Sequence, residues 1–296
     1  MNYFENISQT FKQGSSLIKL IYINISVFVL VKLIIILLLL FNISNSFLVS
    51  YLAIPADLNN LLQHAWTPFT YMFLHEGIMH ILFNMLALFW FGKIFLMFFS
   101  DKQLVGLYLF GGLIAALFYV IAFNIFPYYS PVLHQSLLLG ASGSIMAIIV
   151  ATAFQSPNME MQLLFIGPVK LKYIAIVTVL MSLFGITSSN GGGELAHLGG
   201  ALAGYFFIVS LHQGKDLTKG FSIILDAIIT FFKPRRLKVK YNKSGNKTRM
   251  SDADFNVNKA RKMAEIDKIL DKIKTSGYES LSAEEKKRLF EQGNKK

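Results

Sequence analysis

Residues 20–41 read LIYINISVFVLVKLIIILLLLF, an apolar run that contains a single charged residue, Lys32. About 20 such residues cross the hydrocarbon core of a bilayer as an α-helix. The rest of the chain agrees, because 54% of its 296 residues are hydrophobic, more than a soluble domain usually carries. We therefore expect a membrane protein whose first transmembrane helix lies here. Lys32 leaves three interpretations open: snorkelling, a shifted span and a functional intramembrane charge.

Five further apolar stretches follow, each bounded by polar or turn residues. They cover residues 78–99, 104–126, 137–154, 171–186 and 195–211. The sequence thus predicts an all-α polytopic membrane protein with six transmembrane helices in one bundle. Orientation follows from the basic residues, since short cytoplasmic loops are enriched in Lys and Arg.

The connections that we expect on the outer side of the membrane contain no Lys or Arg. These connections are residues 42–77, 127–136 and 187–194. The remaining connections and the C-terminal region do carry basic residues. Both termini are therefore expected in the cytoplasm, in a multi-pass protein of the bacterial cytoplasmic membrane. The glycine-rich loop 187–193 is expected to be flexible and to act as a lid.

The C-terminal region has a different, aqueous composition. Residues 213–296 hold 21 of the 28 Lys and Arg residues. Phe221 to Phe232 is predicted to be an interfacial helix. Residues 233–249 carry eight basic and no acidic side chains next to the membrane. Anionic lipid headgroups, and not nucleic acid, are therefore the expected partner of this basic segment.

The end of the chain is predicted to form a small cytosolic helical hairpin. Apolar residues with helical spacing define its first helix: Met263, Ile266, Leu270 and Ile273. Gly277 is expected to end that helix, and Ser282 with Glu285 forms a capping-box pattern that opens the second helix. The sequence names no partner for this hairpin.

We accordingly divide the chain into four parts. They are a cytosolic N-terminal segment 1–16, a membrane core 17–212, an interfacial and polybasic linker 213–249, and the hairpin tail 250–296.

Polar side chains inside predicted spans are few, and each is a candidate for function. His80 and Asn84 are four residues apart in the second span, on one helix face. Ser142 lies near the start of the fourth span and His197 near the start of the sixth. The second, fourth and sixth spans all begin on the outer side, so these four side chains should lie at similar depth. A hydroxyl beside an imidazole there suggests a serine nucleophile and its base.

Glycines surround two of these candidates. Gly140 and Gly143 flank Ser142 and would let another backbone approach it. Gly200 and Gly204 follow His197 and form a small-xxx-small face. We expect that face to bring the sixth span close to a neighbouring span, and the fourth is the expected neighbour.

Together these motifs resemble those of the rhomboid intramembrane serine proteases. The resemblance rests on His80-x-x-x-Asn84, on Gly140-Ala141-Ser142-Gly143, and on the Ala-His-x-x-Gly-x-x-x-Gly that begins at Ala196. It covers roughly residues 60–212 and includes His75, which is similar to an extra histidine of that family. It implies a rhomboid-like six-helix bundle that cleaves transmembrane segments of membrane proteins near the outer face.

The resemblance also implies a role for each candidate. Ser142 would be the nucleophile and His197 the general base, in a dyad without a third acid. The backbone N–H of Ser142 and the side chains of His80 and Asn84 would form the oxyanion hole. Neither a metal nor another cofactor is implied. Met146 stands where the family often has an aromatic residue that packs on the base.

Three other functions fit the sequence less well. A zinc protease is disfavoured because His75 and His80 are five residues apart, not four, and therefore diverge on a helix. A transporter is disfavoured because no predicted span contains Asp, and Glu194 lies only at a span edge. An inactive rhomboid-like binding or chaperone protein is the nearest alternative, although both Ser142 and His197 are present.

Overall fold

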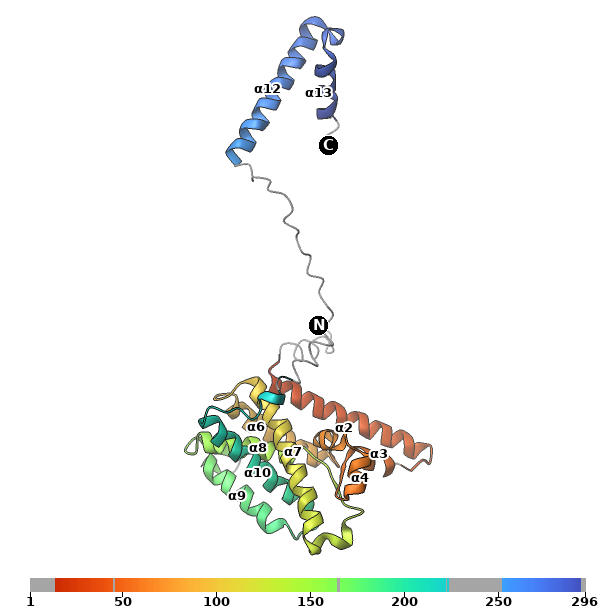
Figure 1. The fold of residues 1–296 in the computed structure, drawn as a ribbon, viewed down its shortest axis with the longest axis vertical. Helices are drawn as coiled ribbons and strands as arrows, with labels where there is room; N and C mark the ends of the chain where they lie inside the picture. Colours follow the sequence, from red (N-terminus) through yellow and green to blue (C-terminus); the bar gives the residue numbers. More distant parts are fainter. Residues whose placement is uncertain (1–13, 45, 164–165, 222, 224–251, 294–296) are drawn as a thin grey trace. The chain divides into compact units, whose positions relative to one another are not determined.

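The computed structural model describes residues 14–293 apart from 45, 164–165, 222 and 224–251. The chain divides into a membrane unit, Met1–Lys233, and a C-terminal unit, Pro234–Lys296. Figure 1 shows the helices of the membrane unit gathered into one bundle. The predicted interfacial helix at 221–232 and the polybasic segment at 233–249 lie almost wholly outside the described residues.

All six predicted transmembrane stretches form helices. They are α2 (Ser16–Leu40), α6 (Ile78–Phe95), α7 (Asp101–Ile125), α8 (Ser142–Gln155), α9 (Leu171–Gly185) and α10 (Gly191–His212). Four of them, α2, α6, α7 and α10, are long and apolar enough to cross a membrane, and α8 and α9 are shorter apolar helices. The structure is thus a helical polytopic membrane bundle, as predicted.

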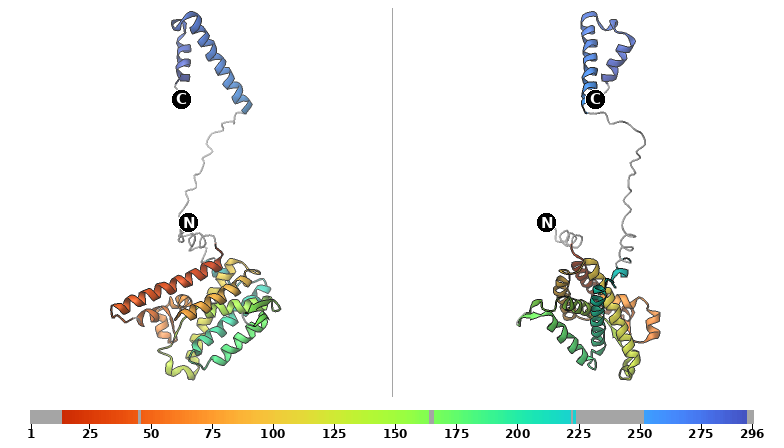
Figure 2. Two further views of the ribbon diagram at one scale, coloured as in Figure 1. Left: turned by 180° about the vertical axis from the view of Figure 1, so that it is seen from behind. Right: turned by 60° about the vertical axis from the view of Figure 1, so that its left-hand side comes forward.

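Helix α8 is the centre of this bundle. It packs against α6, α7, α9 and α10, and its residues from Gly143 to Ala153 are all buried. Figures 1 and 2 show α9 (green) at the periphery, on the side away from α2 (red). At 1.5 Å per residue, the 14 residues of α8 extend about 21 Å, which is less than the roughly 30 Å hydrocarbon core. Helix α8 is therefore too short to cross that core from side to side.

The start of α8 differs from the prediction. We expected helix from residue 137, but Leu137–Leu138 forms the short strand β2, which pairs antiparallel with β1 (Ile54–Pro55). Gly140 then adopts φ +129°, a backbone conformation that favours glycine. The Gly140 N–H donates to the carbonyl oxygen of Tyr71 at 3.0 Å. The pairing of β2 with β1 and the turn at Gly140 therefore keep residues 137–141 out of the helix, which begins at Ser142.

The connection between α2 and α6 is a folded cap and not a simple loop. It comprises α3 (Ser46–Leu52), β1, α4 (Leu58–Gln63), α5 (Thr67–Thr70) and the 3₁₀ helix η1 (Tyr71–Phe73). The Trp66 indole N–H donates to the carbonyl oxygen of Tyr51 at 2.8 Å. Asn124 of α7 donates to the carbonyl oxygen of Ala56, also at 2.8 Å.

Asp57 joins this cap to the segment that leads to β2. Its carboxylate accepts from the backbone N–H of Asn60 at 2.9 Å, as the N-cap of α4. It also pairs with His134 at 2.8 Å. The Asn60 hydrogen bond, followed by the contact with His134, lowers the pKa of Asp57. Side-chain hydrogen bonds to backbone carbonyls, together with this contact between Asp57 and His134, thus hold the cap.

Helix α2 is attached mainly through its first half. Leu17, Leu20 and Asn24 are buried, and the Asn24 amide donates to the Tyr108 hydroxyl at 3.2 Å. Further along, the Lys32 ammonium donates to the carbonyl oxygen of Glu76 at 2.6 Å. Lys32 therefore contacts the residue just before the N-cap of α6, so its side chain has a hydrogen-bond partner.

The connection between α9 and α10 is shorter than predicted. We expected loop through residue 193, but α10 begins at Gly191, so only residues 186–190 link the helices. Gly191 and Gly192 form the first turn of α10, and nearby atoms leave no room for a side chain at either position. A Cβ at Gly192 would lie 2.9 Å from the ring of Tyr119, and one at Gly191 would collide with the carbonyl oxygen of Ile186. The antiparallel strands β3 (Glu160–Leu163) and β4 (Gly167–Lys170), which link α8 to α9, were not predicted.

The C-terminal unit forms the predicted hairpin. Its helices are α12 (Asp252–Ser276) and α13 (Ala283–Gly293), separated by the 3₁₀ helix η3 (Tyr278–Ser280). Gly277 follows α12 with φ +76°. The expected capping box is present: the Ser282 N–H donates to Glu285 at 2.7 Å, and the Glu285 N–H donates to Ser282 at 3.3 Å.

The packed face of α12 differs slightly from the prediction. Ile269 is buried, whereas Met263 and Leu270 are about half exposed. The contact face is therefore centred on Ile269, one residue away from the predicted stripe.

Candidate active site

Ser142 is the first residue of α8, and its surroundings follow from the turn before it. Ala141 occupies the N-cap position and has no side-chain acceptor for the first amides of the helix. Those amides are unpaired by helix geometry, and the helix dipole favours negative charge at this end. The Ser142 hydroxyl thus lies beside backbone donors inside the bundle.

His80 and Asn84 lie one turn apart on α6, as predicted. The Asn84 side-chain amide donates to the carbonyl oxygen of His80 at 3.0 Å, which leaves its second N–H for another acceptor. His80 lies close to the turn before Ser142, because a Cβ at Gly140 would be 3.0 Å from His80 Nε2. His75 contacts the ring of His80 edge to face, with centroids 5.2 Å apart.

His197 reaches the same region because α10 lies directly against α8. A Cβ at Gly200 would collide with the carbonyl oxygen of Gly143, and one at Gly204 with that of Ala147. A Cβ at Gly143 would in turn lie 3.3 Å from the carbonyl oxygen of Ala196. The two backbones are therefore in contact, as the small-residue pattern predicted. Only glycine allows this approach.

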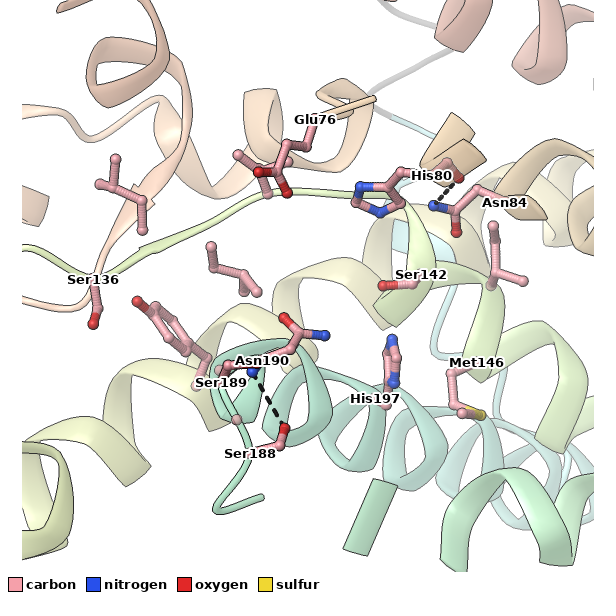
Figure 3. Close-up of a pocket in the computed structure, with 18 of the residues that line it drawn as sticks. Glu76, His80, Asn84, Ser136, Ser142, Met146, Ser188, Ser189, Asn190 and His197 are labelled. Carbon is pink, nitrogen blue, oxygen red and sulfur yellow. Dashed lines mark hydrogen bonds between the residues drawn. The ribbon is translucent and has the colours of Figure 1, made fainter. Parts of the chain in front are cut away.

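The candidate side chains line one cavity of about 920 Å³. Figure 3 shows Ser142 between His80 and His197, with Asn84 next to His80 and Met146 on the His197 side. Ser188, Ser189 and Asn190 from the α9–α10 connection also line it. Gly140, Gly143, Gly200 and Gly204 do not line the cavity, and they act by setting the backbone positions around it. The structure thus brings together the five predicted side chains from α6, α8 and α10.

Ser142 and His197 line the same cavity without a direct hydrogen bond between them. Within the described residues, Ser142 Oγ makes no hydrogen bond to His197 or to another side chain. Catalytic hydrogen bonds are often long in a free enzyme and tighten when substrate binds. Direct proton transfer between these two side chains would need the hydroxyl or the ring to move closer.

Two contacts of His197 were not predicted. Its Nδ1 lies 3.2 Å from Glu194 Oε2, on the preceding turn of α10, and 3.1 Å from Ser182 Oγ of α9. The spacing of Glu194 and His197, three residues along one helix, was a readable signal. Ser182 gave no such signal, because its contact with α10 depends on how the two helices pack.

These features define a class: a polytopic helical membrane protein with a serine and two histidines in one cavity inside its bundle. The model of the Rhomboid domain matches residues 62–214, a region that includes α6 to α10 and so every candidate residue. The chain belongs to the rhomboid family.

A plant relative supports this assignment. The RHOMBOID-like protein 12, mitochondrial, of Arabidopsis thaliana is 30% identical over 158 residues, which cover 50% of this chain and 47% of the relative. The chain therefore spans about half the length of the curated relative that it matches. Residues 251–295 match a second model, a family of unknown function (DUF6576), and this range contains the hairpin helices α12 and α13.

Proposed function

We propose that this chain is an intramembrane serine endopeptidase that cleaves transmembrane segments of other membrane proteins near the outer face. The observation that supports it most is the shared cavity, to which α8 contributes Ser142, α10 contributes His197 and α6 contributes His80 and Asn84. Membership of the rhomboid family agrees with this activity and equally with an inactive relative.

The proposed reaction uses Ser142 and His197 as a nucleophile and base. Ser142 Oγ attacks the carbonyl carbon of the substrate while His197 Nε2 takes its proton. The oxyanion is held by the backbone N–H of Ser142, the His80 ring and the free N–H of Asn84. His197 then gives its proton to the leaving amine, and the acyl group stays on Ser142. Water attacks this acyl group while His197 takes a proton from the water, and His197 then returns that proton to Ser142 Oγ. Neither a cofactor nor a metal takes part in this proposal.

The substrate must expose its backbone before it is cut. A transmembrane helix hides its carbonyl groups in hydrogen bonds, so we propose that substrates carry helix-breaking Gly or Pro near their outer end. Entry would take place between α6 and α9. Helix α9 lies at the bundle periphery (Figure 2), and residues 186–190 would act as the lid. Cross-linking cysteines placed on α6 and α9 should therefore block cleavage, and full activity of the cross-linked protein would exclude this route.

The orientation and the lipid contacts are also proposals. Both termini would be cytoplasmic, in a bacterial cytoplasmic membrane, because Lys and Arg occur on only one side of the predicted topology. Residues 233–249 would bind anionic headgroups. Each basic side chain there contributes about 1 kcal/mol near such a surface.

A reconstituted cleavage assay tests the activity. Wild-type protein should cut a model transmembrane substrate, and Ser142→Ala and His197→Ala should each abolish cleavage while the protein stays folded. Ser144→Ala is the matched control, since Ser144 is buried two residues further along α8, away from the cavity lining. Folded wild-type protein that cuts no membrane substrate, or activity in Ser142→Ala, would instead favour the inactive rhomboid-like binding or chaperone protein, or another site.

A further inference from the structure

A carboxylate and a hydroxyl contact Nδ1 of His197, which is not the ring nitrogen proposed to take the proton from Ser142. Nδ1 lies 3.2 Å from Glu194 Oε2 and 3.1 Å from Ser182 Oγ. A general base must keep the lone pair on the nitrogen nearest the nucleophile, so the ring proton must be on the other one. The groups around Nδ1 therefore decide whether His197 can accept a proton from Ser142.

The carboxylate is the decisive group of the two. An ionised Glu only accepts hydrogen bonds, whereas a Ser hydroxyl both donates and accepts. Ser182 alone would be compatible with either tautomer of His197. Glu194 is compatible only with a proton on Nδ1, because a lone pair there would face the lone pairs of its oxygen.

The packing of α9 holds Glu194 in this position. Ser182 is 2% exposed. One turn further along α9, a Cβ at Gly185 would lie 2.8 Å from Glu194 Cγ and 3.1 Å from Cδ. Gly185 thus leaves the space that the Glu194 side chain fills. Helix α9 contributes both a second hydrogen-bond partner and a slot for the carboxylate.

We infer that Glu194 is a positioning residue that keeps the proton of His197 on Nδ1 and stabilises the imidazolium formed during the reaction, with Ser182 as a secondary acceptor. The site is then a Ser142–His197–Glu194 arrangement and not an isolated dyad. This inference rests on the proposed protease activity. It adds a third residue that touches neither substrate nor the reacting atoms.

Kinetics of Glu194 variants in the full chain test this role. Loss of the corresponding carboxylate partner costs about 10⁴ in kcat in a well-studied serine protease. We expect Glu194→Gln to lower kcat by roughly 10- to 10⁴-fold on the same scale, because Ser182 remains as an acceptor. KM and the melting temperature should change little. Glu194→Ala should lower kcat further, since alanine offers no acceptor for the Nδ1 proton.

A double variant separates positioning from general destabilisation. Ser182→Ala alone should have a small effect, but Ser182→Ala combined with Glu194→Gln should lose more than the two single losses combined, because Nδ1 then loses both of its original partners. Glu160→Gln is the control for a lost carboxylate, since Glu160 is exposed on β3.

The outcomes separate this inference from the proposed function. If wild-type and Glu160→Gln cut substrate and Glu194→Gln matches them in kcat, the positioning role is wrong and the protease proposal stands. If Glu194→Gln loses activity only in step with its melting temperature, Glu194 is structural and the inference is again overturned. An inactive wild-type protein would contradict the proposed function itself.

Discussion

The α-carbon of Gly200 faces the carbonyl oxygen of Gly143 so closely that a Cβ there would collide with it. This contact sets how near His197 comes to Ser142. Gly200→Ala should therefore destabilise the bundle by about 1–3 kcal/mol or more, as overpacking does, and should sharply reduce activity. Thermal unfolding in detergent and a cleavage assay check both effects. Gly220→Ala is the control, because a Cβ at Gly220 meets nothing within 4 Å; equal behaviour of the two variants would contradict this packing.

The bond from Lys32 to Glu76 predicts a change in activity without a large change in stability. A charged residue in a span costs about 3 kcal/mol, and a hydrogen bond to a charged group contributes about 1.5–3 kcal/mol. In Lys32→Met the stability gained by removing the charge nearly equals the stability lost with the hydrogen bond, so the melting temperature should change little. The start of α6 loses its tether, however, so kcat should fall several-fold while Lys32→Arg retains most activity. Unchanged kcat in Lys32→Met would show that the tether has no role in positioning His80.

The cap over the bundle should be sensitive to acid through Asp57. Its pKa is lowered in the folded protein, mainly by the Asn60 N–H and then by His134. A lowered folded pKa gives stability that is present above the unfolded value, about 3.9, and is lost as pH falls through the folded value. Melting temperatures between pH 3 and pH 6 should therefore drop below about pH 4 in the wild type. The melting temperature of Asp57→Asn should drop less over the same range. Identical curves of melting temperature against pH for the variant and the wild type would contradict this role of Asp57.

The C-terminal hairpin should be dispensable for the chemistry. Its two helices form a compact unit of their own, with Lys272 paired to Glu285 at 3.0 Å. We expect the hairpin to bind or regulate, and we expect deletion of residues 250–296 to leave cleavage in detergent largely intact. The measurement is cleavage of a substrate with an unstructured linker. If the truncated protein is folded but as inactive as Ser142→Ala, the hairpin must be part of the catalytic machinery.

Most of the fold could be predicted because lipid imposes a simple rule on sequence. Runs of apolar residues gave the six helices, and the basic residues placed the starts of three of them on one side. That reasoning alone predicted that His80, Asn84, Ser142 and His197 would lie at similar depth in the membrane. The glycine spacing at Gly200 and Gly204 also predicted the contact with α8.

The errors have a common physical cause, which is tertiary contact. Gly192 is typical of loops, but in α10 it lies against the ring of Tyr119. Leu137 and Leu138 are as apolar as a span, yet they pair with β1. Ser182 resembles any small residue of a membrane helix until α9 packs beside His197. Each depends on a partner distant in sequence, which local patterns do not encode.

The central claim is that Ser142 is a nucleophile activated by His197, and covalent labelling tests it most directly. Wild-type protein in detergent is treated with a fluorophosphonate, and the modified peptide is identified by mass spectrometry. The account predicts one adduct, on Ser142, that is absent in Ser142→Ala, strongly slowed in His197→Ala and unchanged in Ser144→Ala. Folded wild-type protein that cleaves substrate but carries its adduct on another residue, or labels equally fast without His197, would contradict it.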